Sequence, residues 1–226
     1  MKLKKHHKLV VAADGSPASG KTTGAKKISK KYGLKFLSSG LLYRFASYQI
    51  LKYKPKNKIS FLKKSFKKLN LKKLNKMNLH SEKISEYTSI IAKEKKIRSI
   101  LKLFQVKFAK RFSKVCIEGR DIGTVILPKA DVKFFFKCDL NTAAKRRFKE
   151  LKKKKNKINF KTVKKSIKLR NFRDISRKHS PLLKSSDAII VDTGKLRNIS
   201  GMMNRMSKIV DRKIKDKYGN WGSNKS

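Results

Sequence analysis

The chain has 226 residues, of which 63 are lysine or arginine and 14 are aspartate or glutamate, so its formal net charge is +49. Hydrophobic residues make up 38% of it, enough to build a core, and no apolar run reaches the roughly 18 residues of a membrane-spanning helix. These numbers exclude a disordered basic tail and predict one large domain or a domain with a small lobe. The charge indicates either a nucleic-acid or other acidic partner, or lysine-rich compositional drift.

The N-terminal residues predict a cytoplasmic protein. A basic start leads into a short apolar stretch, residues 9–13, which runs directly into Asp14 and is too short for a secretory signal. Cys116 and Cys138 lie in separate apolar runs without CxxC spacing, so we expect two buried, reduced thiols and no disulfide.

Short apolar strands alternate with longer amphipathic helices, which is typical of a parallel α/β sheet. In chain order, strands are expected over residues 9–13, 35–37, 115–117, 132–136 and 188–191. Helices are expected over residues 21–31, 41–51, 82–92, 95–112, 141–153, 161–175 and 199–217.

Two acid-free stretches interrupt this alternation. Residues 52–78 contain eleven lysines, and residues 151–173 contain nine lysines and two arginines. Apolar residues near helical spacing predict short basic helices with mobile connections in both stretches. The segment after Tyr218 is expected to fray.

The strongest motif is GSPASGKT at residues 15–22, which fits G-x-x-x-x-G-K-[ST] between a predicted strand and a predicted helix. Glycines let successive N–H groups turn inward around an anion, and the helix N-terminus adds its dipole. Lys21 is expected to reach the β- and γ-phosphates of a nucleotide, and the Thr22 hydroxyl can ligate Mg²⁺. The predicted donor-binding loop comprises Gly15, Ser16, Pro17, Ala18, Ser19, Gly20, Lys21, Thr22 and Thr23.

A second candidate site follows the strand predicted at 115–117, in the sequence VCIEGRDIG. The carboxyl end of a strand is where ligands bind in an open parallel sheet, and Arg120 at that end can bind a phosphate bidentately. Asp121 can orient Arg120 or accept a hydrogen bond from a sugar hydroxyl. The alternative is an ordinary surface Arg–Asp pair.

Arginines replace lysines at the end of the helix predicted over 161–175. Arg170, Arg173 and Arg177 are spaced by three and four, which predicts one helix face presenting three guanidiniums, with Asp174 holding Arg170 by an i,i+4 pair. Such a cluster suits a polyphosphate whose charge spreads during transfer, and the alternative is a solvated basic face.

Residues 38–44, SSGLLYR, place hydroxyls and a glycine at a predicted helix start, with Arg44 one turn further on. This combination predicts a further anion site, although the signal is weak by itself.

Together these segments resemble the bacterial cytidylate kinase family, a branch of the P-loop nucleoside monophosphate kinases. The resemblance covers nearly the whole chain through DGSPASGKTT, SSGLLYR, EGRDIGTVILPKADVKFFF, RRFKEL and LRNFRDISRKHSPLLKSSDAIIVDT. It implies one α/β domain with a P-loop NTPase-type, five-stranded parallel sheet flanked by helices. Its core would be residues 8–51, 113–150 and 176–218, with an acceptor-side insertion at 52–112 and a lid at 151–175.

The resemblance also implies roles for single residues. Ser39, Tyr43 and Arg44 would hold the acceptor nucleotide, while Ser89 and Arg98, nine apart, would contact the cytosine edge or its surroundings. The remaining acceptor-side residues it implies are Glu118, Arg120, Asp121, Arg170, Asp174 and Arg177. Arg146 and Arg147 would begin the lid-side helix, with Arg146 on the donor nucleotide. The predicted catalytic set is Lys21, Arg120, Asp121, Arg170, Arg173 and Arg177.

Three positions depart from the family pattern. The family usually has aspartate where this chain has Ser38 and Glu118, and often arginine where it has Ala143. The insertion between Arg44 and Ser89 is also shorter than in many members, and it is rich in lysine. These departures concern sugar preference and base contacts rather than the transfer chemistry.

The implied activity is phosphoryl transfer from ATP with Mg²⁺ to CMP and dCMP, by a monomer without a membrane or specific nucleic-acid partner. One rival is a nucleic-acid-binding P-loop protein whose charge is its function, but the sequence has no RRM-type aromatics, zinc finger or helix-turn-helix signature. The other is a P-loop kinase for another small acceptor, of the UMP, AMP or shikimate type.

Overall fold

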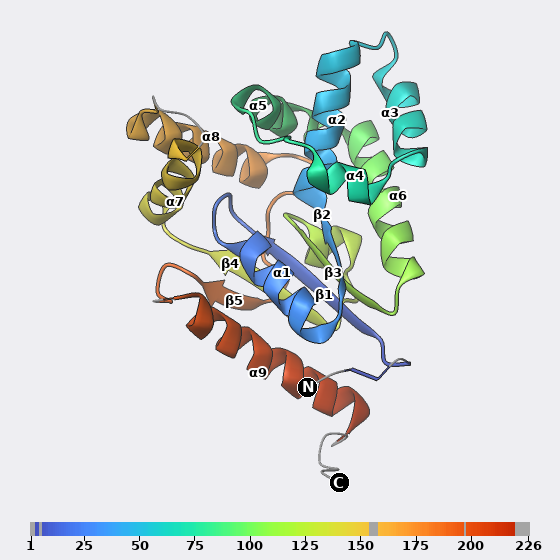
Figure 1. The fold of residues 1–226 in the computed structure, drawn as a ribbon, viewed down its shortest axis with the longest axis vertical. Helices are drawn as coiled ribbons and strands as arrows, with labels where there is room; N and C mark the ends of the chain where they lie inside the picture. The colour runs from blue at the N-terminus through green and yellow to red at the C-terminus, as the bar shows by residue number, and fades with distance from the viewer. Residues whose placement is uncertain (1–2, 5, 154–157, 197, 220–226) are drawn as a thin grey trace.

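Five parallel strands form the centre of the fold (Figure 1). The computed structural model describes residues 3–4, 6–153, 158–196 and 198–219. The strands follow the order β2-β3-β1-β4-β5, and every pairing is parallel. They are β1 (Leu9–Gly15), β2 (Lys35–Ser38), β3 (Lys114–Gly119), β4 (Val132–Lys137) and β5 (Ile189–Asp192). The predicted fold class is confirmed, and each strand lies close to its predicted range.

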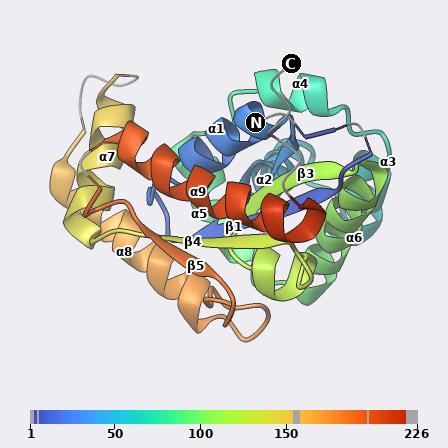
Figure 2. The same ribbon diagram turned by 90° about the horizontal axis from the view of Figure 1, so that it is seen from below.

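Helices cover both faces of the sheet, so the strands are apolar on both sides. Leu9, Val11 and Ala13 of β1 pack with α1 (Lys21–Tyr32) and α9 (Ile199–Tyr218) on one face. Ala12 belongs to the core on the other face, formed with α2 (Ser39–Tyr53), α6 (Lys95–Arg111) and the π-helical turn η1 (Ile122–Ile126). Figure 2 shows α9 running across the sheet beside α1. None of the helices in the described ranges is long and apolar enough to cross a membrane.

The first basic stretch folds as predicted. It forms two short helices, α3 (Lys58–Lys67) and α4 (Leu71–Lys76), which begin at the caps Asn57 and Asn70. Their apolar residues Leu62, Phe66 and Leu74 are buried in the same core as α2 and α6. The lysines therefore lie around a packed apolar stripe, and α5 (Glu82–Ile91) follows as predicted.

The described part of the second basic stretch lies at the end of α7 (Leu140–Lys152) and in α8 (Phe160–Ser176). These helices match those predicted over residues 141–153 and 161–175, whereas the expectation of short helices in this stretch is wrong. Val163 and Ile167 of α8 pack against Ala143, Ala144 and Leu151 of α7. Both views place this pair of helices on the opposite side of the molecule from α3 and α6 (Figures 1 and 2). Residues 154–157 of the predicted lid and the predicted frayed segment 220–226 lie outside the described residues.

Both cysteine thiols are free, as predicted, but they differ in burial. Cys116 lies within β3 and is fully buried, whereas Cys138 lies just after the end of β4 and is half-buried. The expectation of two buried thiols is therefore wrong for Cys138, because β4 stops one residue before it.

The buried carboxylate of Asp14 connects β1 to the turn after β3. Asp14, at the end of β1, accepts the backbone N–H of Ile122 at 2.8 Å and that of Gly123 at 2.7 Å. Burial raises the pKa of Asp14 to about 6, and the two N–H donors oppose this shift. The carboxylate is therefore the form present at pH 7.5, with one oxygen for each N–H group.

We expect Asp14→Ala to destabilise the fold, because it leaves two buried N–H groups without an acceptor. Each loss costs about 1–3 kcal/mol, so the free energy of unfolding should fall by about 2–5 kcal/mol in urea denaturation at pH 7.5. Asp216→Ala, at an exposed position of α9, serves as the control and should change it by less than about 0.5 kcal/mol. Equal stability of the two variants would contradict this role for Asp14.

Candidate active site

A large cavity of about 1020 Å³ opens beside the carboxyl ends of β1, β2 and β3. Its walls come from the loop before α1, from α2, α5 and α6, from the turn after β3, and from α7 and α8. Every predicted site residue except Gly15 and Ser16 lines this cavity. The sheet topology explains the gathering, since the parallel strands all deliver their following loops to one edge.

The loop between β1 and α1 has the backbone geometry of an anion cradle. Gly15 (φ 154°) and Gly20 (φ 81°) both have positive φ, as does Ala18 (φ 55°). A Cβ at Gly15 would lie 2.3 Å from the carbonyl oxygen of Phe136, so the close passage of β4 also requires glycine there. Both glycines thus have the positive φ that the motif predicts.

Lys21 is buried at the base of this loop. Its Nζ lies 3.4 Å from the carbonyl oxygen of Ser16, to which it donates, and 3.8 Å from Oε2 of Glu118. Burial, together with the positive charge of Arg120, lowers the pKa of Lys21 to about 7, and Glu118 only partly opposes this shift. A negatively charged group at this position would relieve that unfavourable environment.

Glu118 and Ser38 come from neighbouring strands and touch one another. Glu118 is the penultimate residue of β3. Its Oε1 accepts a hydrogen bond from the hydroxyl of Ser38, the last residue of β2. The same hydroxyl oxygen accepts the backbone N–H of Leu41 at 3.3 Å and so caps α2. Ser38 therefore links the start of α2 to the carboxylate that faces Lys21.

The predicted anion site at the start of α2 is only partly realised. Ser39 lies in the cavity wall, but Arg44 is buried and donates to the carbonyl oxygen of Leu79 at 2.9 Å and to the Ser85 hydroxyl at 2.7 Å. Burial lowers the pKa of Arg44 to about 9. Arg44 thus ties α2 to α5 while still lining the cavity.

Arg120 and Asp121 point to different partners. Arg120 Nε donates to Asp174 Oδ2 at 2.7 Å, whereas Asp121 forms an ion pair with Arg98 and lies 4.0 Å from Arg177 Nη2. The expectation that Asp121 orients Arg120 is wrong, because side chains of consecutive residues leave the strand end in different directions. The carboxylate that orients Arg120 comes from α8 instead.

The arginine cluster of α8 also differs from the prediction. Arg170 and Arg173 lie on the helix, but α8 ends at Ser176, and Arg177 has extended backbone (φ −67°, ψ 136°). The three therefore do not share one helix face. Asp174 pairs with Arg120 and, at 3.6 Å, with Arg177 Nη1, so the expected Arg170–Asp174 pair is replaced by these two.

The far wall of the cavity is formed by Arg98, Tyr43 and Ser89. The Arg98 guanidinium lies 5.7 Å from the centre of the Tyr43 ring and donates to the carbonyl oxygen of Ala92 at 3.1 Å. Burial raises the pKa of Tyr43 to about 12. The Ser89 hydroxyl accepts a hydrogen bond from Arg173 Nη1 at 2.8 Å.

Thr193, directly after β5, supports two cavity-lining residues from behind the cavity wall, a role that the sequence interpretation did not assign. Its hydroxyl donates to the carbonyl oxygen of Ser19 at 2.9 Å and accepts from Arg146 Nη1 at 2.7 Å. Arg146 Nη2 also reaches the Thr193 carbonyl oxygen, at 2.8 Å. Its position at the carboxyl end of a predicted strand was the signal that could have identified it.

The donor atoms in the cavity fit a metal ion that arrives with a nucleotide. The described histidines, cysteines and acids form no group of three or more that could hold a metal by themselves. Thr22 contributes an exposed hydroxyl to the same cavity wall as Glu118. Hard oxygen donors of this kind suit Mg²⁺, whose remaining ligands are commonly phosphate oxygens and water.

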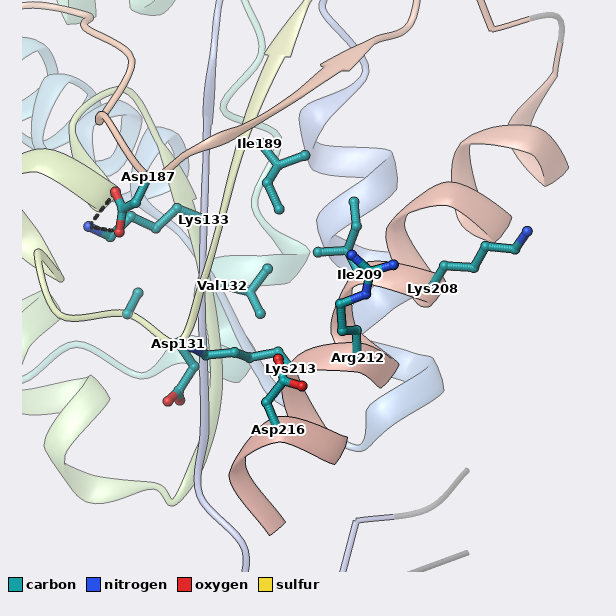
Figure 3. Close-up of a pocket in the computed structure, with 11 residues that line it drawn as sticks. Asp131, Val132, Lys133, Asp187, Ile189, Lys208, Ile209, Arg212, Lys213 and Asp216 are labelled. Carbon is teal, nitrogen blue, oxygen red and sulfur yellow. Dashed lines mark hydrogen bonds and ion pairs between the residues drawn. The ribbon is translucent and has the colours of Figure 1, made fainter. Parts of the chain in front are cut away.

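A smaller pocket of about 390 Å³ lies at the other end of the sheet, between α9 and the first residues of β4 and β5 (Figure 3). Three of its charged residues, Asp131, Lys133 and Asp187, already have partners. Lys133 contacts Asp187 at 2.9 Å, and Asp131 accepts from Lys217 at 2.7 Å and from the Val10 N–H at 2.8 Å. The amino ends of parallel strands are also not where such sheets bind ligands, so the large cavity is the candidate active site.

Comparisons with known proteins agree with this geometry. A protein-family model described as cytidylate kinase matches residues 11–212. A cytidylate kinase from Bartonella tribocorum is 39% identical over 193 residues, covering 83% of this chain and 88% of the relative. One from Thermosipho melanesiensis is 36% identical over 214 residues, covering 91% and 98%. A solved structure of an uncharacterised protein from Eubacterium ventriosum shares the fold, with a TM-score of 0.50 at 17% identity over 90% of this chain and 98% of that one. The resemblance seen in the sequence is confirmed: the chain belongs to the cytidylate kinase family.

Proposed function

We propose that the protein transfers a phosphoryl group from ATP to CMP and dCMP, giving CDP and dCDP. The observation that carries this proposal is one continuous cavity that is lined both by the loop before α1 and by a cluster of arginines. Lys21 belongs to the first group, and Arg120, Arg170 and Arg177 belong to the second, of which Arg120 and Arg170 lie near enough to Lys21 to lower its pKa. Membership of the cytidylate kinase family supports a cytidine nucleotide as the acceptor.

The loop of residues 15–23 would hold the β- and γ-phosphates of ATP, with Lys21 neutralising their charge and Arg146 beside the loop. Mg²⁺ bound with ATP would supply further neutralisation, and the position of Thr22 in the cavity wall supports its hydroxyl as a ligand. Of the predicted lid, residues 151–175, the described residues 151–153 and 158–175 would cover the bound phosphates, and residues 52–112 would form the acceptor side. Such a lid would exclude water during transfer.

The acceptor phosphate would lie between Arg120 and Arg177, whose carboxylate partners hold both guanidiniums in place. Arg98, Asp121 and Ser89 would surround the nucleoside. A phosphate acceptor is already anionic, so the reaction needs positioning and charge neutralisation rather than a general base. That requirement matches a cavity rich in arginine.

The central experiment measures ADP release with CMP, dCMP, UMP, AMP, GMP and shikimate. We expect the highest kcat/KM with CMP and dCMP, and a fall of about 100-fold or more in kcat for Lys21→Met, because a transition-state charge contact is removed. Faster turnover of AMP or shikimate would contradict the proposed acceptor. Absence of any transfer, with salt-sensitive nucleic-acid binding, would favour the nucleic-acid-binding rival.

ATP binding should take up protons at alkaline pH. The pKa of Lys21 is about 7 in the free protein, so this amine is largely neutral at pH 8, and bound phosphates would raise its pKa. Calorimetry at pH 8 in buffers of different ionisation enthalpy should show uptake of nearly one proton, falling toward zero at pH 6. Lys21→Met should remove the uptake at pH 8, and an unchanged proton count in this variant would disprove the assignment.

Arg177→Ala should impair transfer to the acceptor without impairing ATP binding. Transfer to CMP should fall by about 100-fold, since a buried guanidinium facing the acceptor is lost, while the Kd for ATP changes less than about threefold. Arg205→Ala, on the exposed side of α9, is the matched control and should leave both quantities unchanged. Unaltered transfer by the Arg177 variant would refute this role.

A further inference from the structure

Arg173 has a different kind of partner from the arginines that line the phosphate end of the cavity. Arg120 and Arg177 pair with carboxylates, whereas Arg173 Nη1 donates to the neutral hydroxyl of Ser89 at 2.8 Å. This bond connects α8 with α5, across 84 positions of the sequence. Arg173 was predicted to be catalytic, but this contact directs its side chain toward the acceptor-side insertion.

The Ser89 hydroxyl has a second partner that determines where its proton lies. Its Oγ is 2.7 Å from the carbonyl oxygen of Glu86, and a carbonyl can only accept, so the hydroxyl proton points to Glu86. A guanidinium can only donate, so one lone pair of the same oxygen faces Arg173. A hydroxyl oxygen has two lone pairs, and one therefore remains for a ligand.

This remaining lone pair belongs to a residue in the cavity wall. Ser89 is 6% exposed and lines the same cavity as Asp121 and Arg98. A ligand group that meets Ser89 must therefore donate a hydrogen bond, because the proton and the other lone pair are both engaged. An amino group satisfies this requirement, and a carbonyl oxygen does not.

We infer that Arg173 is a positioning residue that fixes the Ser89 hydroxyl as a hydrogen-bond acceptor and so favours an aminopyrimidine nucleotide over an oxopyrimidine nucleotide. The inference rests on the proposed function and adds a residue to its selectivity. Cytosine carries an amino group where uracil carries a carbonyl oxygen. With Arg173 removed, only the Glu86 carbonyl oxygen holds the hydroxyl, which can then turn more readily and donate to the uracil carbonyl, so discrimination should weaken.

The test compares kcat and KM for CMP and UMP in the wild type, Arg173→Met and Arg173→Lys. For Arg173→Met we expect the CMP:UMP ratio of kcat/KM to fall about 5- to 20-fold, mainly through KM, with kcat for CMP within about threefold of the wild type. Lysine is also a pure donor, so Arg173→Lys should restore part of the ratio. Arg205→Met, at an exposed position of α9, is the matched control and should leave the ratio unchanged.

A double-mutant cycle with Ser89→Ala tests whether Arg173 acts through Ser89. In the Ser89→Ala background, Arg173→Met should change the CMP:UMP ratio by less than about twofold, because the hydroxyl that it positions is absent. The inference is overturned if the full effect persists in that background. It is also overturned if Arg173→Met lowers kcat for both acceptors by about 100-fold at unchanged KM, which would indicate a phosphate contact.

The wild-type measurement separates the two proposals. Turnover of CMP by the wild type together with an unchanged CMP:UMP ratio in Arg173→Met would overturn the inference and leave the proposed function standing. Absence of CMP turnover in the wild type would overturn both. If Arg173→Met is poorly folded, as judged by its thermal unfolding, Arg173→Lys carries the same comparison, and a ratio as low as that of Ser89→Ala would contradict the expected rescue.

Discussion

The structure depends on keeping many cations close together in one cavity, and three buried carboxylates make this possible. Glu118 faces Lys21, Asp121 lies between Arg98 and Arg177, and Asp174 lies between Arg120 and Arg177. Like charges a few ångströms apart in a poorly solvated space repel strongly unless opposite charges lie between them. Each acid comes from a strand end or from α8, so the sheet and α8 must assemble correctly before the cations can be held together.

The carboxylates neutralise the cations of the cavity only in part, which favours the binding of an anionic ligand. Within the described part of the chain, Arg177 Nη2 and the Ser19 hydroxyl are buried without a hydrogen-bond partner, and the pKa of Lys21 is lowered. Buried polar groups without partners are costly. An anionic ligand would supply the missing partners, so part of its binding free energy would come from relieving a cost already present in the free protein. The many surface lysines have no such role, because water solvates them.

Much of this could be predicted from the sequence, and what could not has a physical reason. The strands and the loop of residues 15–22 follow from local patterns, namely apolar runs and glycines with positive φ. The ion pairs were mostly mispredicted, because spacing along a helix favours partners within α8, whereas Asp174 meets Arg120 across 54 positions. The contacts of Arg173 and Thr193 were equally hidden, since each forms a hydrogen bond with a residue from a distant segment. The length of α8 was predicted to within one residue at each end, because its polar and apolar residues follow a helical pattern.

The contact between Ser38 and Glu118 gives two departures from the family pattern a common explanation. The family usually has aspartate at both positions, and here the two side chains are hydrogen-bonded neighbours on adjacent strands. A serine in place of one carboxylate removes a like-charge repulsion, while the extra methylene of glutamate lets the other carboxylate reach both the hydroxyl and Lys21. The two exchanges thus compensate one another, and positions 38 and 118 should vary together in evolution.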